Sequence, residues 1–379
     1  MKKTRRLRAI VIGAGWAGEG HTIALRDAGV EVVAMCGRTP QPTQERARQL
    51  GISEVSLDWH KALTEFRPDI VSIATPGNSH QEIALAAAEM GIHILCDKPL
   101  GINADESRGM LIAVNQAGVK HAYGSTSQYD PSFLYAHQLL ADGMIGQMWQ
   151  AEYITHSLFP QRVRYNWVHQ LSLGGGYLNN AFTHHLGQIL RVTGGKVRAS
   201  TGYVARCFGL VPVGSPVHDF REIFGNEIRA DEITEWREAD ADIACTVVVR
   251  IEMHDGGLPT VLFQTSGASI GEYSSYTAFY GTKGTARINL GESNKILLST
   301  TEQPDWKEMV VPQALVDQLP AIEDHTQRDW NQLAREFVAN IQGHEYMGYP
   351  TFYDGWIASE VIDSVRSSSG WVTIPDNPV

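Results

Sequence analysis

Short apolar runs alternate with segments of helical period over the first 120 residues of the chain. The apolar runs are rich in β-branched residues and each is followed by a longer segment whose apolar positions recur every three or four residues. The runs cover residues 8–12, 30–35, 69–74 and 92–96, and the helical segments extend from Gly18 through Ala28, over 43–50, 79–90 and 104–117. Strict alternation of this kind predicts parallel strands joined by right-handed crossovers, a doubly wound sheet.

The turn between the first strand and the first helix is rich in glycine. It reads Gly13-Ala-Gly15-Trp-Ala-Gly18. Glycines also end strands for purely steric reasons, so this spacing alone is weak. Between a strand and a helix, however, it predicts a dinucleotide site, because glycine lets the backbone approach a pyrophosphate and the helix N-terminus offers free N–H groups to it.

Two further polar segments follow strands of the predicted sheet. "TPGNSH" (75–80) follows the third strand and "DKP" (97–99) follows the fourth. Because ligands of doubly wound sheets bind outside the carboxyl ends of the strands, we expect both segments to lie beside the glycine turn.

The pattern changes after Ser127. A helix is expected to open at Tyr129-Asp130-Pro131, and period-two stretches begin near Met148, with few crossover helices between them. This predicts a mostly antiparallel open sheet with helices on one face, closed by helical segments near 326–342 and 354–368. The predicted division is a Rossmann domain over 1–127 and an α+β substrate-binding and oligomerisation domain over 128–379, with 206–240, which has no clear period, as an insertion or partner-binding arm.

Composition narrows the choice of partners. The net charge is −11, so a surface that tracks nucleic-acid phosphates is not expected, and a small-molecule partner is. Four widely spaced cysteines indicate neither a disulfide framework nor a zinc site, which fits a reducing cytoplasm. The chain contains no apolar run of about 18 residues, so no membrane span is expected. The basic N-terminus imitates a secretion signal, but cleavage there would remove the glycine turn.

"GGGYLNNAFTHH" (174–185) is the most conspicuous segment of the second half. Three glycines allow a close approach of the backbone, and the residues after them are expected to begin a helix. On that helix Asn180 and His184, four residues apart, share one face, whereas His185 points about 100° away. His184 is therefore the candidate for chemistry, and His185 is expected to face packing or solvent.

These motifs together resemble the glucose-fructose oxidoreductase, inositol dehydrogenase and rhizopine-catabolism family, Gfo/Idh/MocA. The matches are the glycine turn with His21, Thr75-Pro76 with His80 and Glu82, Asp97-Lys98-Pro99, and the segment at 174–185. Four positions depart from the usual pattern. Asp97 stands for glutamate, Asn180 for aspartate, Phe182 for glycine and Gly187 for aspartate.

The resemblance implies an oxidoreductase in which Lys98 is the principal acid/base and His184 assists it. In the alternative, non-catalytic interpretation, Lys98 is a surface lysine and His184 is a helix residue that hydrogen-bonds to a backbone carbonyl. The amide of Asn180 can orient His184 or a substrate hydroxyl but cannot stabilise an imidazolium. The resemblance also implies pairing through the open sheet, hence a homodimer or homotetramer.

The candidate site has three parts. The catalytic residues are Lys98, His184 and Asn180. The cofactor-binding residues are Gly13, Gly15, Trp16, Ala17, Gly18, Gly37, Arg38, Thr39, Thr75, Pro76, Asn78, His80, Asp97 and Lys98. The substrate-binding residues are Lys98, His156, Arg164, Trp167, Asn180 and His184, with Arg162 nearby. No metal site is expected. NADP is favoured over NAD, because Gly37 stands where NAD enzymes place an acid and Arg38 with Thr39 could hold a 2′-phosphate.

Three functions remain open at this stage. The first is an NAD(P)-dependent dehydrogenase or reductase acting on a secondary hydroxyl or ketone of a sugar, polyol, sugar acid or glycoside. The second is a redox-neutral enzyme that cleaves a glycoside and retains its nicotinamide. The third is a non-catalytic nucleotide-binding sensor.

Overall fold

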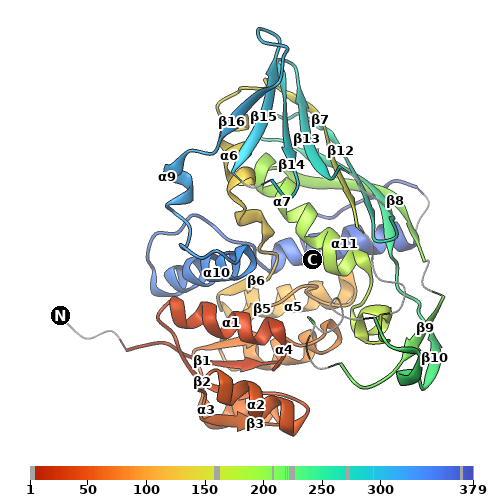
Figure 1. The fold of residues 1–379 in the computed structure, drawn as a ribbon. Coiled ribbons are helices and arrows are strands. Elements are labelled where there is room, and N and C mark those ends of the chain that lie inside the picture. Colours follow the sequence, from red (N-terminus) through yellow and green to blue (C-terminus); the bar gives the residue numbers. More distant parts are fainter. Residues whose placement is uncertain are drawn as a thin grey trace.

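The computed structural model describes residues 5–157, 163–206, 209–217, 219, 221, 227–269, 274–292, 294–367 and 370–378. Six parallel strands form the first sheet, in the order β3-β2-β1-β4-β5-β6 (Figure 1). They are β1 (Arg8–Ile12), β2 (Glu31–Cys36), β3 (Glu54–Ser56), β4 (Ile70–Ile73), β5 (His93–Cys96) and β6 (His121–Tyr123). This order confirms the doubly wound sheet, with the switch of direction between β1 and β4.

Five helices connect these strands. They are α1 (Trp16–Asp27), α2 (Pro40–Gln49), α3 (Trp59–Phe66), α4 (His80–Glu89) and α5 (Ala104–Ala117). The second helix begins at Pro40, earlier than the residue 43 expected from its apolar period, because proline suits the first turn of a helix. β3 and α3 were not anticipated, since β3 has only three residues, none of them buried.

The second sheet has nine strands, in the order β16-β15-β14-β13-β7-β12-β11-β8-β17. They are β7 (Met148–His156), β8 (Lys196–Ala205), β11 (Ala244–Glu252), β12 (Thr260–Ser266), β13 (Tyr276–Gly281), β14 (Gly284–Asn289), β15 (Lys295–Thr300), β16 (Lys307–Val310) and β17 (Val372–Thr373). All neighbours are antiparallel except β7 and β12. Alternate residues of β11, among them Val247 and Val249, are fully buried, which confirms a large, mostly antiparallel sheet with one face in the core.

Helices of the second half join the two sheets. α6 (Pro131–Ala141) and α7 (Thr183–Thr193) lie beside the second sheet, and the short α9 (Gln313–Val316) follows β16 (Figure 1). α10 (His325–Gln342) packs on α1, where a Cβ added at Gly20 would lie 2.1 Å from the ring of Trp330. α11 (Phe352–Ser367) packs on both α5 and β8. The two sheets are thus held together by the last helices of the chain. The strands of the two sheets lie on either side of residue 127, but helices from the second half also pack against the first.

The segment 206–240 contains a small hairpin of β9 (Leu210–Val213) and β10 (Glu235–Glu238). Its Asp219 pairs with Arg46 of α2, and its Arg221 pairs with Glu19 of α1. The segment therefore reaches back to the first domain, and its role as an insertion or partner-binding arm remains a prediction. Within the described ranges, no helix has both the length and the apolar character needed to cross a membrane.

Candidate functional site

The glycine turn leaves the N-terminus of α1 open to an anion. Gly13 has φ +122°, and a Cβ there would lie 2.2 Å from the Ala74 carbonyl oxygen, while one on Gly18 would lie 1.9 Å from that of Gly13. Gly15 caps α1 without a side-chain hydrogen bond, so Trp16 and Ala17 begin a helix whose N–H groups face no capping side chain. A side chain at Gly13 would therefore push the turn away from the end of β4, and one at Gly18 would push α1 away from the turn. A dinucleotide pyrophosphate fits this turn.

Two loops are fixed beside the turn by a buried histidine. His80 is 0% exposed, its Nδ1 lies 2.8 Å from the Pro99 carbonyl oxygen, and its Nε2 lies 2.8 Å from that of Thr75. The Thr75 hydroxyl accepts from the Ser79 hydroxyl at 2.8 Å, and Asn78 is exposed at the tip of the loop. Both ring nitrogens of His80 are thus occupied by backbone, so this residue positions Thr75, Pro76 and the loop that carries Lys98.

The three glycines at 174–176 each meet a different part of the molecule. A Cβ on Gly174 would lie 3.1 Å from the Cα of Gly77, one on Gly175 would lie 2.5 Å from the Trp167 carbonyl oxygen, and one on Gly176 would lie 2.9 Å from both Asp242 carboxylate oxygens. Gly174 and Gly176 also have positive φ values. The triplet therefore lets the second domain approach the loop at Gly77 closely, which answers why the segment needs three glycines in a row.

A buried ion pair orients the segment that follows. Residues 178–182 form a π-helical turn that leads into α7. The Leu178 N–H donates to Asp242 Oδ1 at 2.9 Å, and Arg366 Nη2 of α11 donates to Asp242 Oδ2 at 2.6 Å. Asp242 is 1% exposed. Asp242 and Arg366 were not identified from the sequence, because the two residues lie 124 positions apart and neither belongs to a motif.

Lys98 and Asn180 meet at the junction of the two sheets. The Lys98 Nζ donates to Asn180 Oδ1 at 3.3 Å, and Asn180 Nδ2 donates to the Gly176 carbonyl oxygen at 2.8 Å. The second bond turns the amide so that its oxygen faces the lysine. Burial lowers the pKa of Lys98, and the charge of Asp97 opposes that effect. Asp97 itself accepts from the Lys98 backbone N–H at 2.8 Å. A lowered pKa makes the neutral amine of a lysine, the form that can accept a proton, more accessible.

The two adjacent histidines differ in their surroundings. Burial lowers the pKa of His184 well below its ordinary value, and the Lys98 charge and His185 lower it further, so His184 lies within electrostatic range of Lys98. His185 instead stacks on Tyr153 with ring centroids 4.3 Å apart, and burial lowers its pKa to about 3. Both histidines are therefore neutral at pH 7, and His185 is a packing residue.

The predicted substrate residues occupy separate positions along the approach to the triplet. His156, at the end of β7, hydrogen-bonds through Nδ1 to the Ser269 hydroxyl at 3.0 Å. Arg164 donates to Glu232 at 2.9 Å, so its charge is already paired within the second domain. Trp167 begins a 3-10 turn, and its backbone carbonyl oxygen lies next to Gly175. Arg162 lies outside the described residues, and among the described ones no cluster of three metal-ligating side chains occurs.

The end of β2 has an uncompensated cation. A Cβ on Gly37 would lie 2.1 Å from the Thr43 hydroxyl, so a carboxylate side chain has no room at this position. Arg38 is exposed and makes no hydrogen bond or ion pair with another described residue, and Thr39 is the N-cap of α2. The fixed positive charge at this strand end is that of Arg38.

Comparison with known proteins agrees with this geometry. A family model described as an oxidoreductase family with an NAD-binding Rossmann fold matches residues 7–125, and a GFO/IDH/MocA C-terminal domain matches 133–287. Levoglucosan dehydrogenase of Pseudarthrobacter phenanthrenivorans is 29% identical over 48% of this chain and 49% of its own. D-glucoside 3-dehydrogenase of Escherichia coli is 25% identical over 66% of this chain and 68% of its own. The first of these alignments thus spans about half the length of the relative.

Solved structures share the whole fold at lower identity. A levoglucosan dehydrogenase in complex with NADH and levoglucosan superposes with a TM-score of 0.82, at 21% identity over 98% of this chain and 100% of that one. An oxidoreductase domain protein from Kribbella flavida gives 0.81 at 22% identity over the same shares. At such identities the likeness establishes the arrangement of the two sheets.

Proposed function

Because this chain belongs to the GFO/IDH/MocA family of oxidoreductases, we propose that it is an NAD(P)-dependent dehydrogenase or reductase. Its substrate would carry a secondary hydroxyl or ketone, on a sugar, polyol, sugar acid or glycoside. The observation that carries the proposal is the contact of Lys98 with Asn180 at the junction of the two sheets. The glycine turn, the 75–80 loop and the triplet converge on the same junction.

The dinucleotide, when bound, supplies the site that accepts or releases hydride. In the direction of oxidation, the neutral amine of Lys98 takes the proton of the substrate hydroxyl at Nζ, and in reduction the ammonium returns it. Burial favours the neutral amine, since desolvation disfavours the charged form. Asn180 holds Nζ in place through its oxygen, and the neutral His184 offers a second group for a substrate hydroxyl.

We further propose that NADP is bound more tightly than NAD. Arg38 is exposed at the end of β2, and Gly37 leaves no carboxylate to repel a 2′-phosphate. Among the similar proteins whose names state a cofactor, one structure is a complex with NADH and one dehydrogenase is named for NAD⁺. The preference for NADP over NAD is therefore proposed from Arg38 of this chain alone.

A homodimer or homotetramer is proposed as the assembly. The outward-facing positions of β8, β11 and β12 include Tyr203, which is 65% exposed, and the partly exposed Val248 and Leu262. Val248 lies directly opposite Leu262 in the sheet. Apolar side chains on the outer face of a sheet are found at subunit interfaces, and here they lie among polar ones such as Thr246 and Gln264.

A substrate panel tests the proposed function. The purified protein is incubated with NAD or NADP and with levoglucosan, D-apiose, methyl glucoside, scyllo-inositol and gluconate, and both reduced nicotinamide and sugar products are measured. We expect reduced nicotinamide to form in proportion to product. Glycoside cleavage without net reduction would instead support the redox-neutral function, and dinucleotide binding without any product would support a sensor.

A further inference from the structure

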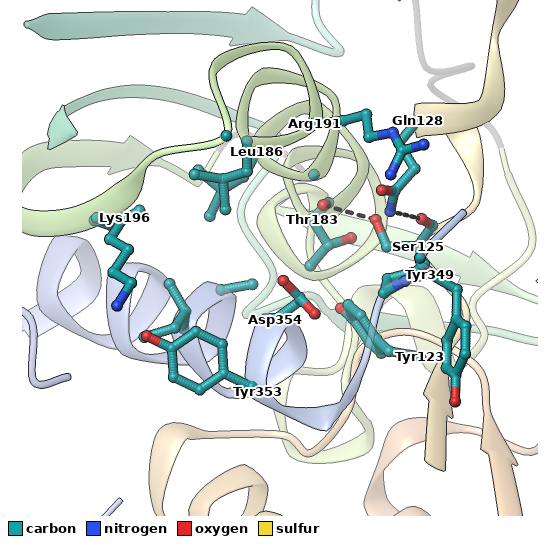
Figure 2. A pocket seen from close by; sticks show the side chains of 18 of the residues that line it. Tyr123, Ser125, Gln128, Thr183, Leu186, Arg191, Lys196, Tyr349, Tyr353 and Asp354 are labelled. Atoms are coloured by element: carbon teal, nitrogen blue, oxygen red, sulfur yellow. Dashed lines mark hydrogen bonds between the residues drawn. The ribbon is translucent and has the colours of Figure 1, made fainter. Parts of the chain in front are cut away.

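A cavity separate from the Lys98–Asn180 junction, here called the second cavity, borders α7, the helix that carries His184. It has a volume of about 370 Å³, and its walls come from the end of β6, from α7, from the loop 348–350 and from α11 (Figure 2). Tyr123, Thr183, Gly187, Arg191 and Asp354 are among its lining residues, whereas Lys98, Asn180 and His184 are not. The volume lies in the lower part of the range of small-molecule pockets, so it would hold one small ligand.

Two polar groups of the wall lack partners. Tyr123 is 1% exposed, and its buried hydroxyl, which lies beside the Thr183 side chain, is within normal hydrogen-bond distance of no described residue. Arg191 makes no hydrogen bond or ion pair within the described part of the chain, although its Nε is buried. Buried donors without acceptors are costly, since each loses its contact with water without gaining another. A ligand in the cavity could supply an acceptor to both groups.

Gly187 leaves room in the cavity beside Arg191, whose charge is felt by the Glu336 carboxylate of α10. Gly187 lies one helical turn before Arg191 on α7, and it lines the cavity. The Gfo/Idh/MocA pattern usually has an aspartate at position 187, four residues before Arg191. At this spacing an acidic and a basic side chain can pair on a helix. A Cβ at 187 would lie 2.8 Å from the Ser125 hydroxyl, so any side chain there enters the cavity.

The remaining polar groups suit a hydroxylated ligand. Asp354 accepts from the Thr351 N–H at 2.7 Å and from its hydroxyl at 2.9 Å, both through Oδ2. Figure 2 shows the Asp354 carboxylate pointing into the cavity, with the Lys196 and Arg191 side chains on different walls. Burial raises the pKa of Asp354, and its hydrogen bonds from Thr351 oppose that effect. The aromatic rings of Tyr349 and Tyr353 supply apolar faces.

We propose that this cavity binds one small polyhydroxylated carboxylate, of the sugar-acid class, at a site separate from Lys98. The planar guanidinium of Arg191 matches a carboxylate with two parallel hydrogen bonds. The Tyr123 hydroxyl and the free carboxylate oxygen of Asp354 face the ligand's hydroxyl groups. This site is independent of the proposed dehydrogenase reaction, and it places a ligand on α7, which carries His184 and follows the turn that carries Asn180.

Calorimetric titration of the dinucleotide-loaded protein with D-gluconate tests the proposal. We expect Gly187→Asp and Arg191→Gln each to weaken gluconate binding by at least about tenfold, the usual effect of losing a charge-assisted hydrogen bond. Gly187→Ala, which adds a side chain without charge, should keep more of the affinity than Gly187→Asp. Lys98→Met should bind gluconate at this site as the wild type does. Neutral D-glucose should bind at least about tenfold more weakly than gluconate.

The proposal is overturned if gluconate does not bind, or if Gly187→Asp and Arg191→Gln leave its affinity unchanged. Loss of all binding in Lys98→Met would assign the ligand to the catalytic junction instead. Tight binding of glucose 6-phosphate without binding of gluconate would contradict the carboxylate assignment. Melting temperatures of the four variants, compared with that of the wild type, establish that each is folded. A failure of this proposal leaves the substrate panel above unaffected, because that panel reports on turnover.

Discussion

The Lys98 Nζ lies 3.3 Å from the amide oxygen of Asn180, although the two residues are 82 positions apart in the chain. Lys98 follows β5 of the first sheet, and Asn180 lies in the turn before α7. The amide is held in this orientation by its bond to the Gly176 carbonyl. The relationship brings the Asp97-Lys98-Pro99 motif and the segment 174–185 into one candidate site.

Asn180→Asp is expected to move the pH dependence of oxidation to higher pH. Under the proposed role of the neutral Lys98 as the base, kcat/KM should rise with pH through the Lys98 pKa, which burial lowers from 10.5. A carboxylate beside Nζ would favour the ammonium and raise that pKa, by about 1 unit or more. The measurement is kcat/KM against pH for the wild type and Asn180→Asp, with Asn180→Ala as control. An unmoved limb in Asn180→Asp would show that another group titrates.

Arg366→Met should destabilise the protein strongly. It would leave Asp242, 1% exposed, buried without its partner, and such a loss costs about 3–5 kcal/mol. Arg335→Met is the matched control, because its pair with Asp27 is exposed and should contribute less than about 1 kcal/mol. Urea unfolding measures both. Equal losses in the two variants would mean that the Asp242 pair does not anchor the turn at 178–182.

Arg38→Ala should discriminate between the two dinucleotides. We expect the Kd for NADP to rise about tenfold, since a charge-assisted hydrogen bond contributes about 1.5–3 kcal/mol, and the Kd for NAD to change little. Fluorescence titration with NADPH and NADH measures both constants, and Arg48→Ala, an exposed arginine of α2, serves as control. A similar loss for NAD would mean that Arg38 contacts the part common to both cofactors.

Light scattering at micromolar concentration should give at least a dimer. Leu262→Glu, which places a charge on the outer face of β12, should shift the mass toward the monomer, whereas Leu57→Glu, at an exposed position of the first domain, should not. A wild-type monomer would refute the proposed assembly. An undiminished oligomer in Leu262→Glu would place the interface elsewhere.

The sequence predicted well what depends on local period. The helix over Ala104–Ala117 and the doubly wound parallel sheet follow from the alternation of apolar runs with helical segments. The three-residue β3 escaped because a strand so short has no measurable alternation.

Features built from distant residues could not be found in this way. The π-helical turn at 178–182 depends on Asp242 and Arg366, and the second cavity depends on Tyr123, Gly187 and Asp354. Nothing in the local sequence of these residues reveals that folding brings them together.

Replacement of Lys98 by methionine tests the central claim most directly. With the best substrate of the panel, Lys98→Met should lower kcat by at least about 10²-fold, the usual contribution of a positioned proton-transfer group. The Kd for the dinucleotide should stay within about threefold of the wild type, because Lys98 acts on the substrate proton. Lys61→Met, at an exposed position of α3, should retain wild-type rates. Wild-type turnover in a folded Lys98→Met protein would contradict the assignment of Lys98 as the acid/base of this site.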